Sequence, residues 1–302
     1  MSAVERAPVV ELTQRRSAPL AAFVSLRPRQ WTKNLLLFAG IIFAAKLGDA
    51  VRWLEAVAAF GAYCAASSAA YLVNDVRDAS HDRAHPVKRM RPIARGEMSP
   101  RAACAFAAVL LAVATALVAP LGLASLGFLG AFVLLQASYT LRLKHVVLID
   151  VMTIAGLFVV RAAAGAAGVH VRISPWLLLC TALLALFLAL AKRRGELVLV
   201  GADATPGRPV LAGYSLVLVD QLVAVVAACT IIAYSLYTFT ARDSKALMVT
   251  IPFVVFGVFR YLLLIHRQDL GEEPEEVLLR DPPILICIAA WAICAAIILV
   301  LT

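Results

Sequence analysis

Asn74, Asp78 and Asp82 recur every fourth residue at the end of a long apolar run. On a helix this spacing lines their side-chain oxygens along one face, within about two turns. Neighbouring carboxylates repel each other unless a cation lies on them. Mg²⁺ suits such a row because it takes one or two carboxylates, keeps several waters and completes its shell with substrate phosphates. The spacing therefore predicts Asn74, Asp78 and Asp82 as metal ligands and catalytic residues that hold a phosphorylated substrate.

Further cations, tyrosines and acids lie near this row or at the ends of other apolar segments. Each alone also fits a membrane-interface anchor, because Lys, Arg and Tyr often mark that interface. The acidic stretch itself also fits a solvated loop that keeps the rim of a membrane protein soluble. Recurrence at several segment ends favours one shared polar cavity above the membrane core. The candidate substrate-binding residues are Lys33, Tyr71, Asp75, Lys88, Arg89, Arg91, Tyr139, Lys144, Asp150, Arg161, Lys192 and Arg193.

Arg161 stands apart because it lies inside an apolar segment, roughly three turns from its start. A charge at such a depth costs about 2.5–3.5 kcal/mol on insertion scales, so we expect Arg161 to face the bundle interior and pair with an anion. That anion is either Asp150 or a ligand phosphate. Asp150 and Arg161 share a helix face but are too far apart to touch, which leaves room for a phosphate between them. Arg260, nearer a segment end, is expected to reach the interface.

The composition predicts the elements that must position these residues. Hydrophobic residues make up 62% of the 302-residue chain and charged residues 16%, with a mean hydropathy of +0.88. This polar content is too low to cover a water-soluble globule, so we expect an all-α, polytopic membrane protein. The first 30 residues lack the apolar core of a signal peptide, which predicts a cytoplasmic segment at 1–30 and one transmembrane domain at 31–302. The nine predicted spans are about 34–48, 53–73, 101–119, 122–141, 146–168, 174–191, 212–240, 246–265 and 282–301.

The distribution of basic residues predicts the orientation. Most of the 28 Lys and Arg residues lie on the side of the N-terminus and of the acidic row. By the positive-inside rule this side is cytoplasmic, which predicts a multi-pass protein of the cell's inner membrane with its active site facing the cytoplasm. The net charge of +9 sits in short loops between apolar runs, so topology explains it better than nucleic-acid binding. The six cysteines are scattered and indicate neither a disulfide framework nor a zinc site.

The acidic row also carries a resemblance to a known family. Asn74-xxx-Asp78-xxx-Asp82, placed after the second of nine spans, resembles the UbiA superfamily of intramembrane prenyltransferases. The resemblance implies a nine-helix bundle with a cytoplasmic cavity and Mg²⁺ as cofactor. Four segments in order are similar to one branch of that superfamily, the phosphoribosyltransferases that act on decaprenyl phosphate. These segments are Leu26–Asn34, Tyr71–Asp78, Tyr139–Lys144 and Lys192–Leu197.

This branch implies a specific reaction. Its members transfer 5-phosphoribose from phosphoribosyl diphosphate to decaprenyl phosphate and release diphosphate, which supplies the lipid-linked arabinose donor for cell-wall arabinan. In this reading Lys33, Lys88, Arg89 and Arg91 would grip the donor, and Tyr139, Lys144, Arg161 and Lys192 would lie nearer the lipid phosphate. Membrane lipids are expected to surround the protein, and the sequence leaves open whether it forms a homo-oligomer.

One departure from the superfamily pattern bears on the branch. Ordinary members carry a second Asp-rich motif, usually DxxxD, whereas Asp150 here is followed at that spacing by Ile154. This argues against a second full metal site, although a metal near Asp150 stays open, and it fits a monophosphate lipid held by cations. Two alternatives remain: a UbiA-type prenyltransferase with a polyprenyl diphosphate donor and an aromatic acceptor, or a lipid or small-molecule transporter in which Arg161 marks the substrate path.

Overall fold

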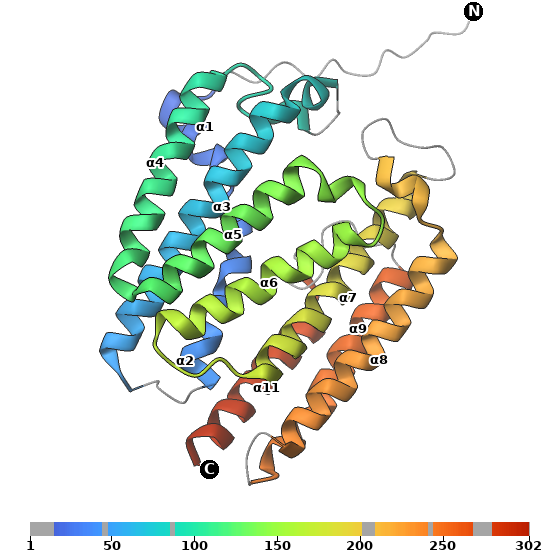
Figure 1. The fold of residues 1–302 in the computed structure, drawn as a ribbon. Coiled ribbons are helices and arrows are strands. Elements are labelled where there is room, and N and C mark those ends of the chain that lie inside the picture. Colours follow the sequence, from blue (N-terminus) through green and yellow to red (C-terminus); the bar gives the residue numbers. More distant parts are fainter. Residues whose placement is uncertain are drawn as a thin grey trace, which may run out of the picture.

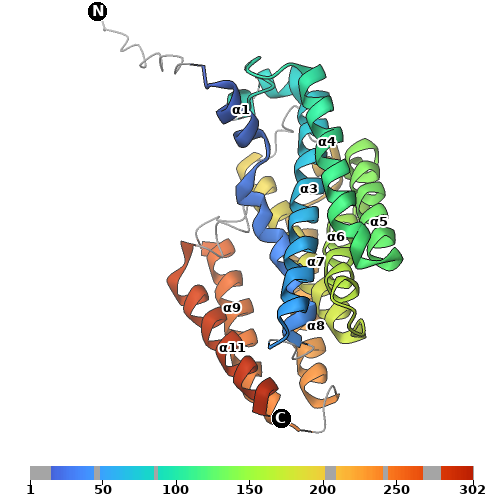
Figure 2. The same cartoon turned by 90° about the vertical axis from the view of Figure 1, so that its left-hand side faces the viewer.

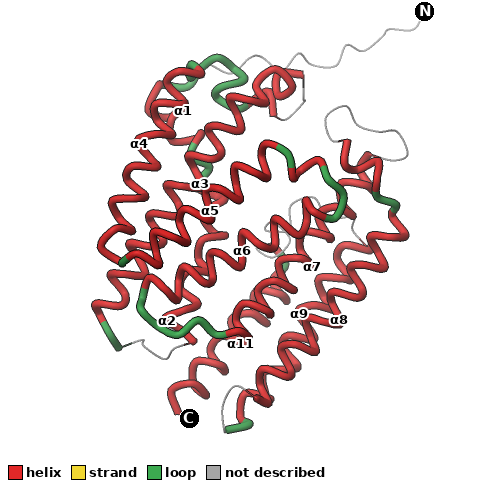
Figure 3. The backbone as a smooth tube through the Cα atoms, viewed as in Figure 1, coloured by secondary structure: helices red, strands yellow, loops and turns green. Residues whose placement is uncertain are grey.

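The computed structural model describes residues 15–43, 48–84, 88–200, 209–240, 244–267 and 280–301. These ranges fold into helices joined by turns and contain no strand (Figure 3), which confirms the predicted all-α class. Among the described residues, seven helices are long and apolar enough to cross a membrane, and Pro282–Ile298 forms a shorter apolar helix. The chain is therefore a multi-pass membrane protein. Residues 1–14 lie outside the described ranges, and the domain boundary at residue 30 stays a prediction.

The helices follow one another through short 3₁₀ segments. The α-helices are α1 (Ala18–Ser25), α2 (Ala39–Phe43), α3 (Ala50–Ala84), α4 (Pro100–Val118), α5 (Leu123–Leu141), α6 (Ile149–Gly168), α7 (Pro175–Val200), α8 (Leu216–Thr240), α9 (Ile251–Arg267) and α11 (Pro282–Leu301). The 3₁₀ segments are η1 (Pro28–Phe38), η2 (Lys88–Met90), η3 (Ala119–Leu121), η4 (Leu143–His145), η5 (Pro209–Gly213) and η6 (Ala246–Thr250).

Helices that are neighbours in sequence mostly pack side by side. α3 contacts α4, α6 contacts both α5 and α7, and α7 contacts α8 (Figure 1). The view turned by 90° shows α9 and α11 as a pair on one side of the bundle (Figure 2), and these two helices contact each other. The last turns of α3 and α5 and the first turn of α6 reach the same end of the molecule, which is the upper end in Figure 1. The polar residues at these ends are thereby gathered together.

Local sequence explains several helix ends. The side-chain oxygen of Ser99 caps α4 by accepting a hydrogen bond from the backbone N of Ala102 at 3.2 Å. Pro100 begins the helix, where its missing N–H leaves no bond unmade. Gly122 leads into α5 with a φ of 97°, a conformation that residues with side chains rarely adopt. The predicted spans 101–119 and 122–141 accordingly match α4 and α5.

The predicted first span, residues 34–48, is different in the structure. Its described part forms the end of η1 and the short α2, and both pack against α6. A Cβ atom added to Gly165 would lie 2.2 Å from the carbonyl oxygen of Leu37, and one added to Gly40 would lie 2.7 Å from the Cα atom of Ala166. Backbones this close require glycine at both positions. Packing against α6 therefore holds a 3₁₀ segment where the apolar pattern indicated a membrane helix.

Candidate active site

The acidic row lies on a single helix, because α3 continues well beyond its apolar part to Ala84. The structure divides the row into two halves. Since a turn takes 3.6 residues, each step of four residues moves a side chain about 40° around the helix. Asn74 and Asp78 therefore lie together, and the Nδ2 atom of Asn74 donates a hydrogen bond to Oδ2 of Asp78 at 3.0 Å. Asp82 lies on nearly the same helix face as Asp75, because the two are seven residues, or about two turns, apart.

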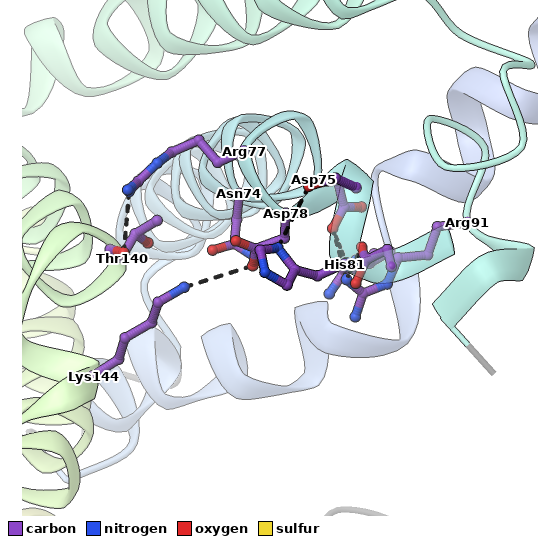
Figure 4. Close-up of polar contacts among 11 residues, drawn as sticks. Asn74, Asp75, Arg77, Asp78, His81, Arg91, Thr140 and Lys144 are labelled. Carbon is purple, nitrogen blue, oxygen red and sulfur yellow. Dashed lines mark hydrogen bonds and ion pairs between the residues drawn. The ribbon is translucent and has the colours of Figure 1, made fainter. Parts of the chain in front are cut away.

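Asp78 is the more accessible of the carboxylates in this stretch. Its side chain is 34% exposed, whereas the side chains of Asp75 and Asp82 are almost fully buried. Lys144, which follows α5 in η4, places its Nζ atom 3.6 Å from Oδ2 of Asp78 (Figure 4). A solvent-accessible carboxylate with a cation beside it can meet a metal and an anionic substrate at the same time.

Asp75 and Asp82 are held by arginines from two other segments. The Nη1 atom of Arg91 donates to Oδ1 of Asp75 at 3.1 Å and to Oδ2 of Asp82 at 2.6 Å. Arg27 forms a second ion pair with Asp75, and its guanidinium lies 4.8 Å above the ring centroid of Tyr71. Buried carboxylates need such partners, since an unpaired buried charge is strongly destabilising. This half of the row therefore joins α3 to the segments on either side of it.

Asp150 belongs to a separate buried network. It is fully buried and accepts hydrogen bonds from Nε of Arg193 at 2.7 Å and from the hydroxyl of Tyr214 at 2.6 Å. The same hydroxyl accepts from the backbone N of Leu148 at 2.7 Å, a residue with a φ of 67°. Burial and the bond to Asp150 raise the pKa of Tyr214, so the phenol stays neutral and donates. Arg193 also pairs with Glu196, and the network ties α6 to α7.

Arg161 is buried, as predicted, but its partner is not Asp150. Its Nε atom donates to Oδ1 of Asn34 at 2.8 Å, and its Nη1 atom donates to the carbonyl oxygen of Leu157 at 3.1 Å. Its guanidinium also lies 4.7 Å from the ring centroid of Phe132. Within the described part of the chain Arg161 forms no ion pair. Its hydrogen-bond partners are neutral, and through Asn34 it holds η1 against α6.

The other predicted residues of the site lie on η1, η2, α5 and α7. The Nζ atom of Lys33, in η1, donates to Oε1 of Gln30 at 2.6 Å. Tyr139, near the end of α5, and Lys192, about two turns before the end of α7, are half-buried, while Lys88 and Arg89 are exposed on η2. Of the predicted cations, Arg91 and Lys144 contact the acidic row directly.

Arg260 has a specific partner instead of simply reaching the interface. It donates to both carboxylate oxygens of Asp281, at 3.3 Å and 2.9 Å. These hydrogen bonds hold the pKa of Asp281 below its ordinary value. The pair joins α9 to the start of α11 and lies outside the candidate site.

Two residues that complete these networks were not predicted. Arg27 lies in the Leu26–Asn34 segment that carried the family resemblance, so that segment was the available signal. Arg27 also has a φ of 54°, which is a left-handed backbone conformation. In this conformation its side chain contacts both Asp75 and Tyr71. Tyr214 gives no comparable signal, because nothing in its local sequence indicates that it meets Asp150.

The donor atoms at Asn74 and Asp78 fit a magnesium ion. The amide nitrogen of Asn74 donates to Asp78, which leaves its oxygen available to a ligand, and the carboxylate of Asp78 is accessible. One carboxylate and one amide oxygen leave most of a Mg²⁺ shell to water and substrate phosphates, which is the usual arrangement. Among the described residues, no group of three or more His, Cys, Asp or Glu could hold a metal ion. One carboxylate and one amide oxygen are the donors available here to a metal that completes its shell with substrate phosphates.

Known proteins share both the sequence and the fold. The model of the UbiA prenyltransferase family matches residues 35–280. The chain is 34% identical over 284 residues to the decaprenyl-phosphate phosphoribosyltransferase of Mycolicibacterium smegmatis, covering 88% of each chain. It is 32% identical over 282 residues to that of Corynebacterium glutamicum, covering 89% of this chain and 84% of the relative. A solved UbiA homologue from Archaeoglobus fulgidus bound to DMAPP and Mg²⁺ matches with a TM-score of 0.70 at 18% identity, over 93% of this chain and 100% of that chain, and so shares the fold.

Proposed function

The chain belongs to the UbiA prenyltransferase family, and from this premise we propose that it transfers 5-phosphoribose from phosphoribosyl diphosphate to a polyprenyl phosphate such as decaprenyl phosphate. The observation that carries the proposal is the identity of about one third, along 88% of the chain, to relatives named decaprenyl-phosphate phosphoribosyltransferase. The site supports it, because one accessible acidic centre lies among several cations, as two anionic substrates require.

In the proposed reaction Asn74 and Asp78 would hold Mg²⁺, which when bound would neutralise the charge of the diphosphate leaving group. Asp82 stays a proposed ligand, directly or through water, while its Oδ2 atom accepts from Arg91. The bond between C1 of ribose and the diphosphate oxygen breaks, and its electron pair leaves with diphosphate. A phosphate oxygen of the lipid forms the new bond to C1. Because the lipid phosphate is already an anion, no strong general base is needed, and the protein acts mainly by positioning.

Separate cations are needed to bind the two substrates, because both substrates are anions and repel each other. We assign Lys33, Lys88 and Arg89 to the phosphates of the donor, because they lie on the segments that flank the acidic row. We assign Lys144, with Tyr139 and Lys192, to the lipid phosphate. Asp150 and Arg193 tie the start of α6 to α7. The proposed orientation has this end in the cytoplasm, where a soluble donor reaches it.

The first test follows label from the donor into lipid. Purified protein in detergent with decaprenyl phosphate, Mg²⁺ and labelled phosphoribosyl diphosphate should transfer label to the organic phase and release diphosphate in equal amount. Asp78→Ala should lower this rate by at least about a hundredfold, because it removes the accessible metal ligand. Glu55→Gln, on the same helix far from the site, is the matched control and should keep full activity. Near-normal transfer by a folded Asp78→Ala protein would exclude the metal assignment.

The same preparation separates the alternatives. If a polyprenyl diphosphate with an aromatic acceptor releases diphosphate and phosphoribosyl diphosphate does not, the chain is a prenyltransferase. If neither donor releases diphosphate, the transferase proposal fails, and movement of lipid across vesicles becomes the activity to measure.

A further inference from the structure

Glu97, in the connection between α3 and α4, is a carboxylate held by two arginines. Its side chain is 1% exposed. Its Oε2 atom accepts a hydrogen bond from Nη1 of Arg16 at 3.2 Å, and its Oε1 atom accepts from the backbone N of Arg16 at 3.3 Å. Nε of Arg95 lies 3.2 Å from the same Oε1 atom. A buried carboxylate needs such partners, so Glu97 holds both arginines in place.

Arg16 extends this contact to η2. Its Nη1 atom also donates to the carbonyl oxygen of Met90, the last residue of η2, at 3.1 Å. η2 begins with Lys88 and Arg89, the two cations assigned above to the phosphates of the donor. One arginine therefore joins Glu97 to the end of the segment that carries these cations.

The backbone that precedes Glu97 is a compact turn. The backbone N of Glu97 donates to the carbonyl oxygen of Pro92 at 2.8 Å, and Gly96 has a φ of 73°, a conformation that glycine adopts without strain. Ile93 is 3% exposed and packs in an apolar cluster shared with α3 and α4. Arg91, which precedes Pro92, pairs with the acidic row. Glu97, η2 and the acidic row are thereby connected through one short stretch of chain.

Arg16 also connects Glu97 to the N-terminal part of the described chain. It lies just before α1, and α1 contacts α3. Figure 2 shows α1 near the upper end of α3. After α1 the chain reaches Arg27, which pairs with Asp75. The stretch from Arg16 to Arg27 is therefore tied at one end to Glu97 and at the other to α3.

We propose that Glu97 is a positioning residue that fixes η2, with Lys88 and Arg89, beside the acidic row for the phosphates of the donor. The proposal rests on the proposed function and concerns a residue that does not touch the substrate itself. A 3₁₀ segment of three residues has few hydrogen bonds of its own, so its direction depends on contacts such as that of Arg16 with Met90.

The acceptor side of the site does not depend on this connection. Lys144 and Lys192, which we assign to the lipid phosphate, lie on η4 and α7. Loss of the Glu97 carboxylate should therefore act on the donor and spare the acceptor. A general loss of structure would affect both substrates.

The test compares KM for the two substrates. Glu97→Ala should raise KM for phosphoribosyl diphosphate by about tenfold, because the cations that bind it lose their fixed position. KM for decaprenyl phosphate and kcat should change by less than about twofold. Glu97→Gln keeps an oxygen that can accept from Arg16, so it should raise KM for the donor by a smaller factor.

Asp281→Asn is the matched control. Its carboxylate is also well buried, with 11% of the side chain exposed, and it is also held by an arginine, Arg260, outside the candidate site. The control should lower the unfolding temperature, because it weakens an ion pair of the same kind. It should leave KM for both substrates unchanged.

A double variant tests whether Glu97 acts through Arg16. Arg16→Ala should raise KM for phosphoribosyl diphosphate by a factor similar to that of Glu97→Ala. The two substitutions together should raise it no further than Glu97→Ala does, because both break the same connection. A double variant whose KM rises by the product of the two single factors would overturn this route.

The remaining outcomes separate the positioning role from the function. An unchanged KM for phosphoribosyl diphosphate in folded Glu97→Ala and Arg16→Ala proteins, or an equal rise in KM for both substrates, would overturn the assignment while the transferase function stands. If Glu97→Ala does not fold, Glu97→Gln and Arg16→Ala decide the question by the same measurements. Absence of phosphoribosyl transfer by the unmodified protein would instead overturn the function, and the assignment of Glu97 with it.

Discussion

Asp78 differs from Asp75 and Asp82 in what surrounds it. The latter two are buried and paired with Arg91 and Arg27, which join α3 to the segments on either side of it. Asp78 is accessible, with an amide on one side and Lys144 at 3.6 Å on the other. Residues of one type in one sequence pattern thus have two different environments, decided by the cations that reach them.

The role of Arg161 also depends on which residues lie around it. It contacts Asn34, which also donates to the Sγ atom of Cys64 at 3.4 Å. Cys64 lies about 21 Å along α3 from Asp78, so Arg161 acts far from the reacting phosphates. We therefore interpret Arg161 as a positioning residue for η1, which carries Lys33 and follows Arg27.

Asn34→Asp distinguishes positioning from direct binding. The new carboxylate keeps the contact with Arg161 as an ion pair, so KM for both substrates should stay near the unmodified value. Arg161→Met should lower the free energy of unfolding by about 1–3 kcal/mol, because it leaves the oxygen of Asn34 without its buried donor. It should also lower kcat/KM through displacement of η1. If Asn34→Asp instead raises KM for decaprenyl phosphate as much as Arg161→Met does, Arg161 binds the lipid phosphate itself. Substrate kinetics and thermal unfolding measure both effects.

Among the elements, η1 has the most unusual position. It is a 3₁₀ segment held between α3 and α6, and 3₁₀ runs of its length are uncommon. Trp31 donates its Nε1 to the hydroxyl of Ser68 at 3.1 Å, which fixes η1 to α3. Gly165 fixes the other side by allowing the backbone of Leu37 to lie directly on α6. The cations carried on and next to η1 are placed by this two-sided packing.

Gly165→Ala should disturb the site indirectly, because the added methyl group contacts η1 and none of the site residues. The added methyl would meet the carbonyl oxygen of Leu37 at 2.2 Å, so η1 must move, and both kcat/KM for phosphoribosyl diphosphate and the unfolding temperature should fall. Gly168→Ala is the matched control on the same helix, where the added methyl would make ordinary contacts with the Cβ atom of Ala59 at 3.5 Å and the Cδ1 atom of Leu121 at 3.7 Å. Alanine favours helix over glycine by about 1 kcal/mol, so the control should be neutral or stabilised. Normal kinetics for Gly165→Ala would show that η1 does not depend on this contact.

At the scale of the whole molecule, helix packing and ion pairs between segments hold the fold together. The pair of Asp150 and Arg193 ties α6 to α7, and the pair of Arg260 and Asp281 ties α9 to the start of α11. The proposed metal site contributes only one accessible carboxylate and one amide oxygen, both from α3. A metal bound there joins the protein to its substrate and is not needed to join one helix to another.

Removal of Mg²⁺ should therefore separate activity from stability. EDTA should abolish transfer, and excess Mg²⁺ should restore it, while the unfolding temperature of the substrate-free protein stays unchanged. Phosphoribosyl diphosphate with Mg²⁺ should raise the unfolding temperature, because a ligand that binds only the folded state stabilises it. At a ligand concentration of a hundred times Kd the free energy of unfolding rises by about 2.7 kcal/mol. Asp78→Ala should lose this rise. A drop in the unfolding temperature of substrate-free protein on adding EDTA would indicate a structural metal instead.

The sequence by itself determined the features that depend on local pattern. Apolar runs predicted the membrane helices from α3 onward, because crossing a bilayer requires length and hydrophobicity that are visible in one segment. Four-residue spacing predicted that Asn74, Asp78 and Asp82 share a helix, because helical periodicity is also local. The burial of Arg161 followed from the cost of a charge in lipid.

Only the tertiary structure decided which charged groups meet. Asp150 pairs with Arg193 and Tyr214, and Arg161 bonds to Asn34 across 127 positions of the sequence. The short segment after Arg27 packs as η1 because Gly165, far along the chain, leaves room for it. These choices depend on how distant segments approach one another, and the strength of an ion pair depends on that distance and on burial. Neither quantity is encoded in the residues next to each charge.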